Sequence, residues 1–335
     1  MADRRRRHCG SRCDGRFVLL AAGIVATTAA EQSAAAPPFI REWGSYGALP
    51  GEFNLPRGID VSADGRVFVT DNHNHRVQVF DTEGTFLYSW GARGSGPGQF
   101  DEPRGILLHG GYVDVVDAGN DRVQRFTESG SYVLEWGQPG TGDGQFDFPS
   151  RIALDGAGDL YVTDGLHSRV QKFTGAGVFL LTWGSEGAGN GQFAGTDGVA
   201  VDPAGSIQVV DYQNHRVQVF DPLGSYVAQW GGPGSGVGQL NGPSAIRLGA
   251  VGLYVTDTFN HRIQIFSLSG VALDAWGQAG SGPGEFNAPQ DVAFDAQGNV
   301  YVADSLNNRV QVFGETPVGL ERTSWGRVKV EYRSE

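Results

Sequence analysis

Short apolar or alternating runs recur along the chain, separated by turns rich in glycine and aspartate. One unit contains the runs 58–61, 67–70 and 76–80, followed by a fourth run that ends in Trp-Gly. Runs of this length, bounded by Gly, Pro, Asn and Asp, are typical of β-strands joined by hairpin turns. Each unit therefore predicts four short antiparallel strands.

The unit occurs six times in register. Each second run ends in an aspartate, and an arginine five residues later opens Val/Ile-Gln-x-Phe. Successive aspartates are 46 or 47 residues apart, a period typical of propellers and solenoids. The six pairs are Asp71 and Arg76, Asp117 and Arg122, Asp164 and Arg169, Asp211 and Arg216, Asp257 and Arg262, and Asp304 and Arg309.

A single four-stranded sheet with two apolar faces is not stable alone, whereas radial stacking of such sheets buries both faces. The sequence therefore predicts an all-β fold, a six-bladed β-propeller of four-stranded blades. The run 39–43 resembles the fourth strand of a unit but precedes any first strand. The last unit lacks a fourth strand at the usual place. We expect residues 39–43 to complete the last blade and close the ring.

The two ends of the chain fall outside the repeats. Residues 1–30 combine a basic segment with the apolar run 17–30, which is typical of a signal peptide. Residues 31–38 are then a linker, 39–316 the propeller, and 317–335 a tail or an extra edge strand. Both cysteines precede the apolar run, so the mature chain would contain no disulfide. We expect a secreted, periplasmic or extracellular monomer with no transmembrane segment after cleavage.

The net charge of the chain limits the classes of partner that it can bind. The net charge is −12, and loss of residues 1–30 removes six arginines and two aspartates, which brings it to −16. A protein this acidic repels phosphate backbones unless it carries a concentrated basic patch, and no basic run follows Arg16. We therefore expect no nucleic acid partner. A protein, a peptide or a small polar or acidic ligand remains.

The repeated motif resembles the NHL repeat. It reads Tyr-Val-Thr-Asp-x-x-Asn-His-Arg-Ile/Val-Gln-x-Phe and is preceded by Gly-x-Phe-x-x-Pro. Its fullest forms contain residues 74–76, 214–216 and 260–262, each reading Asn-His-Arg. The resemblance covers residues 39–316 and implies a six-bladed propeller. It does not imply one function, because similar proteins bind RNA or protein, serve as extracellular sensor domains, or act as peptide-amidating lyases.

Features that all six copies share are required by every blade, so we interpret the Asp/Arg pairs as structural. The Trp-Gly pairs and the Gly-x-Phe residues have the same interpretation. The loop Gly94–Gly98 joins two predicted strands and no helix follows it, so it does not match a dinucleotide-binding loop. We predict no catalytic residues from the motifs.

The histidines of the loops raise an alternative function. Histidines from several blades could hold a zinc ion with an open coordination position, and the resemblance to peptide-amidating lyases implies such a site. However, His75, His215 and His261 occupy a repeat position that other blades fill with Asp121, Ser168 and Asn308. We therefore predict no metal site and no cofactor, and keep zinc or calcium for the alternative, a metal-dependent lyase or hydrolase.

Positions that differ between the copies are free to bind a ligand. The loop before each first strand and the turn between the second and third strands lie on one face of a propeller. Arginines come from the first three blades, whereas carboxylates and aromatic residues come mainly from the last three. The candidate ligand-binding residues are Arg57, Arg104, Arg151, Asp197, Asp291, His73, His167, Tyr212 and Phe259.

An arginine fork suits a carboxylate or phosphate. We therefore expect an exported, non-catalytic scaffold that binds a ligand or a protein at the mouth of its central channel. The alternative is the metal-dependent enzyme acting at the same mouth.

Overall fold

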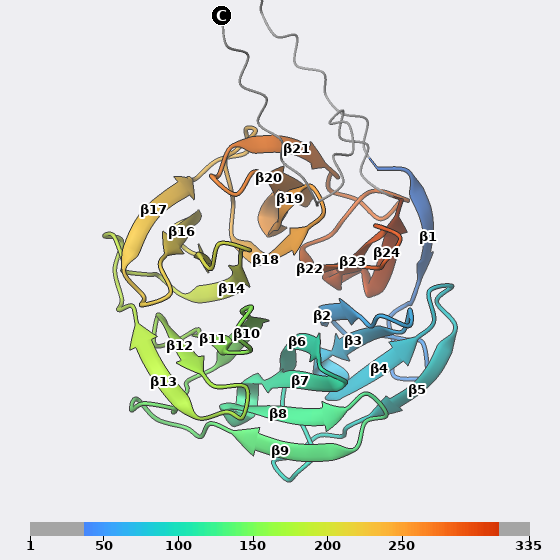
Figure 1. The fold of residues 1–335 in the computed structure, drawn as a ribbon. Helices are drawn as coiled ribbons and strands as arrows, with labels where there is room; N and C mark the ends of the chain where they lie inside the picture. The colour runs from blue at the N-terminus through green and yellow to red at the C-terminus, as the bar shows by residue number, and fades with distance from the viewer. Residues whose placement is uncertain (1–36, 315–335) are drawn as a thin grey trace, which may run out of the picture. The chain divides into compact units, whose positions relative to one another are not determined.

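The computed structural model describes residues 37–314. They form six four-stranded antiparallel sheets arranged around a central axis (Figure 1). The predicted six-bladed propeller is therefore confirmed. The predicted signal peptide 1–30, residues 31–36 of the linker and the tail 317–335 lie outside the described residues.

We number the blades in chain order. Blade 1 contains β2 (Pro56–Val61), β3 (Val67–Asp71), β4 (Arg76–Phe80) and β5 (Phe86–Trp90). Blade 2 contains β6 (Pro103–His109), β7 (Tyr112–Asp117), β8 (Arg122–Thr127) and β9 (Tyr132–Trp136). Blade 3 contains β10 (Pro149–Leu154), β11 (Leu160–Asp164), β12 (Arg169–Phe173) and β13 (Phe179–Trp183).

Blade 4 contains β14 (Thr196–Val201), β15 (Ile207–Asp211), β16 (Arg216–Phe220) and β17 (Tyr226–Gly231). Blade 5 contains β18 (Pro243–Gly249), β19 (Gly252–Asp257), β20 (Arg262–Phe266) and β21 (Ala272–Trp276). Blade 6 contains β22 (Pro289–Phe294), β23 (Val300–Asp304), β24 (Arg309–Phe313) and β1 (Phe39–Trp43). Short 3-10 turns follow the second strand in four blades: η1 (Asn72–Asn74), η2 (Ala118–Asn120), η3 (Thr258–Asn260) and η4 (Ser305–Asn307).

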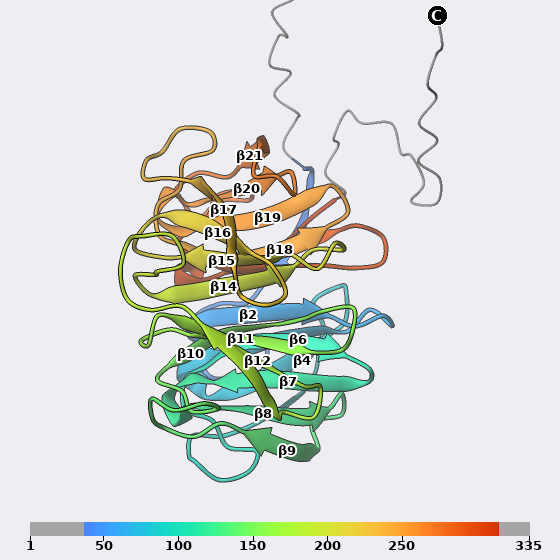
Figure 2. The same cartoon turned by 60° about the vertical axis from the view of Figure 1, so that its left-hand side comes forward.

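The first strand of every blade faces the central axis and the fourth forms the outer edge (Figure 1). The side view in Figure 2 shows the blades as layered sheets, with the connecting loops gathered at the two ends of the strands. Because a second strand such as β3 is covered by a blade on each side, all five of its residues are buried. The loops at one end of the first strands therefore meet around the axis.

The ring closes where the sequence predicts. Strand β1 pairs with β24 in antiparallel register, with Phe39 opposite Phe313 and Trp43 opposite Val310. The last blade is thus built from both ends of the propeller sequence, and β1 covers the edge of β24 as the fourth strand does in the other blades.

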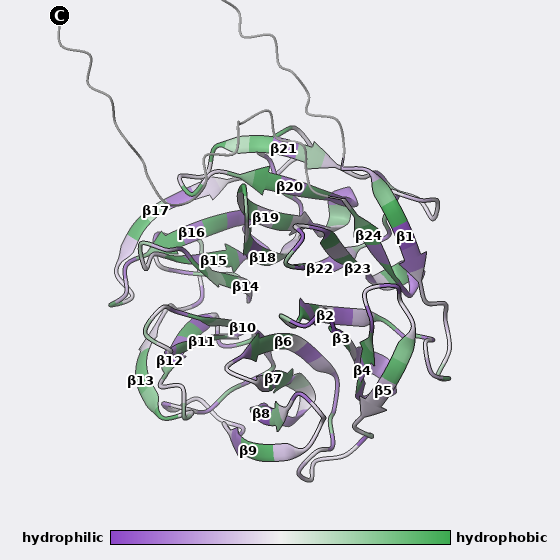
Figure 3. Ribbon diagram, turned by 45° about the vertical axis from the view of Figure 1, so that its right-hand side comes forward, coloured by the Kyte–Doolittle hydropathy of each residue, from purple (hydrophilic) through white to green (hydrophobic). Residues whose placement is uncertain are grey.

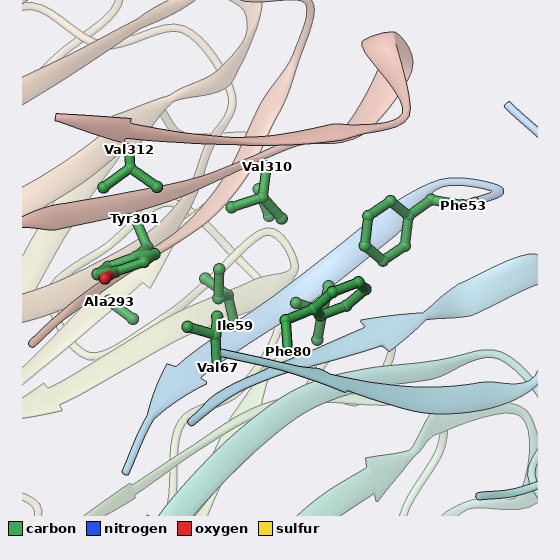
Figure 4. Close-up of a cluster of buried hydrophobic side chains, with 10 residues drawn as sticks. Phe53, Ile59, Val67, Phe80, Ala293, Tyr301, Val310 and Val312 are labelled. Atoms are coloured by element: carbon green, nitrogen blue, oxygen red, sulfur yellow. The ribbon is translucent and has the colours of Figure 1, made fainter. Parts of the chain in front are cut away.

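The hydrophobic core lies between the blades. One cluster joins Phe53, Ile59 and Phe80 of blade 1 and its loop to Tyr301 and Val310 of blade 6 (Figure 4). The tryptophan that ends each fourth strand packs on the phenylalanine that ends the third strand of the next blade, as Trp43 does on Phe80 with ring centroids 5.7 Å apart. The repeated aromatic residues therefore hold one blade to the next.

Candidate functional site

Each blade carries the same buried network around the aspartate that ends its second strand. In blade 5, Asp257 Oδ1 accepts a hydrogen bond from the backbone N–H of Asn241 (2.7 Å). Its Oδ2 accepts from Arg262 Nε (2.7 Å) and Gln264 Nε2 (2.9 Å). The Nε to Oδ2 distance is 2.7–2.8 Å in all six blades, in the pairs Asp71–Arg76, Asp117–Arg122, Asp164–Arg169, Asp211–Arg216, Asp257–Arg262 and Asp304–Arg309.

The arginine of each pair also fixes the glycine-rich loop that leads to the first strand. In blade 2, Arg122 Nη2 donates to the carbonyl oxygens of Gly96 (2.9 Å) and Gln99 (3.0 Å). A carbonyl group of the loop Gly94–Gly98 thus faces Arg122, the arginine of the same blade. These contacts use the repeated charges to shape the loops of each blade.

The residue before each repeat arginine joins neighbouring blades. It has left-handed backbone geometry with φ of 53–55°, and its side chain accepts a hydrogen bond from a backbone N–H of the next blade's loop. The acceptor and donor pairs are His75 and Glu102 (3.2 Å), Asp121 and Phe148 (2.7 Å), Ser168 and Gly195 (3.2 Å), His215 and Gly242 (2.9 Å), His261 and Ala288 (3.2 Å), and Asn308 and Leu55 (3.0 Å). The position requires a hydrogen-bond acceptor, and His, Asp, Ser and Asn each provide one, which explains why these residues interchange here.

Replacing His215 by alanine should lower the free energy of unfolding by about 1–3 kcal/mol, because the N–H of Gly242 loses its acceptor. His215→Asn should retain most of the stability, since Asn308 fills this position in blade 6 and asparagine tolerates left-handed geometry. Urea denaturation of both variants checks this. Equal stability of the two variants would contradict the assigned role.

A cavity of about 430 Å³ opens at one end of the central channel and takes lining residues from all six blades. This volume lies within the range of small-ligand pockets, about 300–1,000 Å³. Of the nine candidate residues, five line the cavity: Arg57, Arg104, Asp197, Tyr212 and Phe259. We call this cavity the mouth.

A β-bulge at the start of each first strand places these side chains. The pairing register shifts between Pro56 and Ile59 in blade 1, and the other five first strands shift at the same point. A bulge re-aims side chains away from the regular alternation. In blade 1 the hydroxyl of Thr70 accepts from Gly58 N (2.7 Å) and donates to Arg104 O (2.7 Å), which fixes the bulge to the next blade. Figure 3 shows hydrophilic segments on the innermost strand β2 beside hydrophobic ones.

Two candidate residues lie below the mouth, as part of its floor. Arg151 is 3% exposed, and its Nη2 donates across the channel to the carbonyl oxygen of Gln290 (2.6 Å). Asp291 is fully buried and receives Arg247, whose Nη2 lies 2.9 Å from Asp291 Oδ2. Arg247 also donates across the channel to Ile106 O (3.0 Å). The channel is therefore crossed by two guanidinium groups from different blades.

The mouth holds more positive than negative charge. Arg57 donates to Gln290 Oε1 (3.2 Å) and Arg104 to Ser150 Oγ (3.3 Å), both neutral acceptors. The Nε atoms of both arginines are buried without a hydrogen-bond partner, as is Oδ1 of Asp197. No hydrogen bond among the described residues satisfies these three atoms, so the fold leaves part of the polar capacity of these side chains unused.

Burial shifts the pKa values of these groups. It lowers the pKa of Arg57, and burial together with repulsion from Arg57 and Arg151 lowers the pKa of Arg104 to about 10. Burial also raises the pKa of Asp197, although the three arginines oppose the shift. A bound anion would relieve the repulsion among the arginines, so the site favours negative charge.

The opposite side of the mouth is apolar. The rings of Tyr212 and Phe259 form an edge-to-face pair with centroids 6.1 Å apart. Leu166, Phe259 and Leu306 are 69%, 51% and 52% exposed, and all three line the cavity. Solvent-exposed apolar side chains gathered around a polar pocket are typical of a binding surface.

The two candidate histidines lie outside the cavity lining. His73 is exposed on the turn of blade 1. His167 occupies the position that asparagine fills in other blades, and its Nδ1 lies 3.1 Å from Asp164 Oδ2. Within residues 37–314, no three His, Cys, Asp or Glu side chains are grouped so that they could hold a metal ion.

Sequence reasoning missed several residues of the channel. Phe148 lines the mouth, and the Arg104 guanidinium lies over its ring, 4.3 Å from the centroid. Arg247 and Asp60 lie deeper, and burial raises the pKa of Asp60. Both occupy the position four residues after the loop proline, where blades 2, 3 and 6 carry Leu107, Ala153 and Ala293. A charged residue at a position that is apolar in other blades was therefore the sequence signal that could have identified Arg247 and Asp60.

Comparisons with known proteins identify the repeats. Residues 53–80, 146–173, 197–220 and 286–313 match the NHL repeat, so the chain contains NHL repeats. It is 43% identical over 47 residues to B-box type zinc finger protein ncl-1 from Caenorhabditis elegans. That match covers 14% of this chain and only 6% of the worm protein, about one repeat.

Two solved structures share the fold. A Bacteroides thetaiotaomicron protein of unknown function has a TM-score of 0.61 at 16% identity, covering 84% of this chain and 74% of its own. A catalytically inactive variant of virginiamycin B lyase from Staphylococcus aureus, solved with quinupristin, has a TM-score of 0.56 at 17% identity, covering 79% and 82%. At these identities the likeness extends to the fold alone. No helix within residues 37–314 is long and apolar enough to span a membrane.

Proposed function

We propose that this six-bladed propeller of NHL repeats is an exported, non-catalytic binding protein, which holds an acidic ligand or an acidic segment of a protein in its mouth. The NHL propeller scaffold fits a protein-binding role. The observation that carries the proposal is the pair of half-buried guanidinium groups, Arg57 and Arg104, which line the cavity and have neutral hydrogen-bond partners. Guanidinium groups without a carboxylate partner suit a carboxylate or phosphate ligand.

The alternative function, a metal-dependent lyase or hydrolase, draws on the fold shared with virginiamycin B lyase. The groups of the mouth favour binding instead. Its lining contains arginine, aspartate, tyrosine, serine and threonine but, among the described residues, no histidine. His75, His215 and His261 each accept a hydrogen bond that joins two blades.

Arg104→Gln should lower the affinity for anionic probes by about tenfold or more, because a hydrogen bond to a charged group contributes about 1.5–3 kcal/mol. The probes are small carboxylates and a hexaglutamate peptide blocked at both ends, titrated by calorimetry at low salt. Arg93→Gln is the matched control, since Arg93 is exposed and lies outside the mouth. Binding that is equal in both variants would refute the proposal. Mass spectrometry of the incubated peptide detects any turnover, which would favour the alternative.

Asp197→Asn is the opposite control, and it should strengthen binding because it removes the carboxylate that competes for the arginines. Since burial raises the pKa of Asp197, wild-type affinity should increase as the pH falls through that raised value. The increase holds while the probe remains ionised, and Asp197→Asn should abolish this pH dependence.

A further inference from the structure

We propose that the ligand of the mouth is a chain end that carries a terminal carboxylate beside an apolar side chain. This inference rests on the binding function proposed above. Two sources have this chemistry: the C-terminus of a peptide with an apolar last residue, and a free small carboxylic acid with an aromatic group.

Side chains bridge the channel below the mouth, which favours the end of a chain over its middle as the ligand. Loops of all six blades surround the cavity. Below it, Arg151 bridges to Gln290 O and Arg247 bridges to Ile106 O, each across the channel. A chain that passed through would have to displace these buried guanidinium groups. A ligand that inserts only the end of its chain does not have to pass these groups.

The charges of the mouth suit one carboxylate. The charged lining residues that the structure describes are Arg57, Arg104 and Asp197, which leaves one positive charge uncompensated. Arg57 and Arg104 have neutral hydrogen-bond partners. A carboxylate has two oxygens and carries a negative charge, so it can accept N–H donors from two guanidinium forks in strong, charge-assisted hydrogen bonds.

The aromatic side of the mouth explains why the proposed ligand carries an apolar side chain beside its carboxylate. Tyr212 and Phe259 pack edge to face, and the exposed Leu166 and Leu306 line the same cavity. A C-terminal residue carries its side chain and its carboxylate on the same carbon atom. It therefore presents both groups to the two unlike walls of one cavity, whereas a glutamate side chain presents only the charge.

Phe148 provides an independent observation. All six blades have left-handed geometry at this position, which Leu55, Glu102, Gly195, Gly242 and Ala288 occupy in the other blades. The turn therefore belongs to the repeat, whereas the aromatic side chain is particular to blade 3. Its ring lies under the Arg104 guanidinium, 4.3 Å from the centroid. Its role here is to hold Arg104 toward the cavity.

The test uses acetyl-Gly-Ser-Gly-Phe with a free C-terminal acid. The same peptide as its amide, the acid peptide with glycine in place of phenylalanine, and 3-phenylpropionate are compared with it by calorimetry. We expect the acid peptide to bind at least tenfold more tightly than its amide and than the glycine peptide. Arg104→Gln should remove the preference for the acid, and Phe259→Ala the preference for phenylalanine.

The outcomes separate the two proposals. Equal binding of the acid and the amide, together with arginine-dependent binding of the blocked hexaglutamate peptide, would refute the chain-end assignment and leave the binding function standing. No binding of any probe would refute both. If 3-phenylpropionate matches the tetrapeptide, the source is a small free acid, and if the tetrapeptide binds more tightly, it is a peptide C-terminus.

Phe148→Gly distinguishes a binding role from a structural one. The unfolding midpoint should stay close to that of the wild type, because glycine relieves the left-handed geometry. Affinity for the acid peptide should fall by several fold, since Arg104 loses the ring beneath it. A variant that loses stability but keeps wild-type affinity would assign Phe148 to the fold alone and contradict the inference.

Discussion

Replacing Asp257 by alanine should lower the free energy of unfolding by about 3–5 kcal/mol, the usual effect of removing one partner of a buried ion pair. Asp257 is fully buried, and its carboxylate accepts hydrogen bonds from Asn241, Arg262 and Gln264. Asn260 Nδ2 also donates to this carboxylate (2.9 Å), so alanine leaves the donors of four residues without this acceptor. Because proteins of this size are typically stable by only about 5–15 kcal/mol, one substitution among the six copies removes much of the total.

Two further variants identify the cause of this loss. Asp257→Asn keeps the shape and one acceptor oxygen, so its effect should be smaller than that of alanine. Asp143 is an exposed aspartate of a glycine-rich loop, and Asp143→Ala should change stability by less than about 0.5 kcal/mol. Urea denaturation, followed by tryptophan fluorescence, measures all three. If Asp257→Ala and Asp143→Ala had similar effects, the network would contribute little to stability.

The fold was predictable because the sequence contains six copies of one repeat, and each copy forms the same four-stranded blade. The fixed spacing of the Asp/Arg pairs determined the number of blades, and the unpaired run 39–43 indicated how the ring closes. The structure confirms both. The repeats also explain the histidines, although the reason became visible only with the geometry. His215 and Asn308 share one role because each accepts a backbone N–H from the next blade.

The mouth was harder to predict, because side-chain direction depends on the bulge in each first strand. The sequence places Arg57, Arg104 and Arg151 near the axis, but the bulge lets the first two line the cavity while Arg151 bridges the floor. Phe148 was missed because its loop position carries unrelated residues in the other blades, from Leu55 to Gly242. No periodic pattern marks such a position.

The second large effect concerns closure of the ring. A chain that starts at residue 44 lacks β1 and should be destabilised by more than about 5 kcal/mol relative to one that starts at residue 37. Trp43 is half-buried and packs on Phe80 with ring centroids 5.7 Å apart. Loss of a fully buried tryptophan costs about 3–5 kcal/mol, and Trp43 contributes a part of this. The deletion also removes the ion pair between Glu42 and Arg309 (2.7 Å) and the whole ladder to β24.

The exposed edge of β24 gives this prediction a second readout. An open strand edge pairs with any suitable segment, so a synthetic peptide of residues 37–43 should restore part of the lost stability when added in excess. The chain from residue 44 should also associate with itself at high concentration, which light scattering detects. An unfolding midpoint equal to that of the chain from residue 37 would show that the ring does not depend on β1. The outer strand would then be an accessory to five complete blades and a three-stranded sixth.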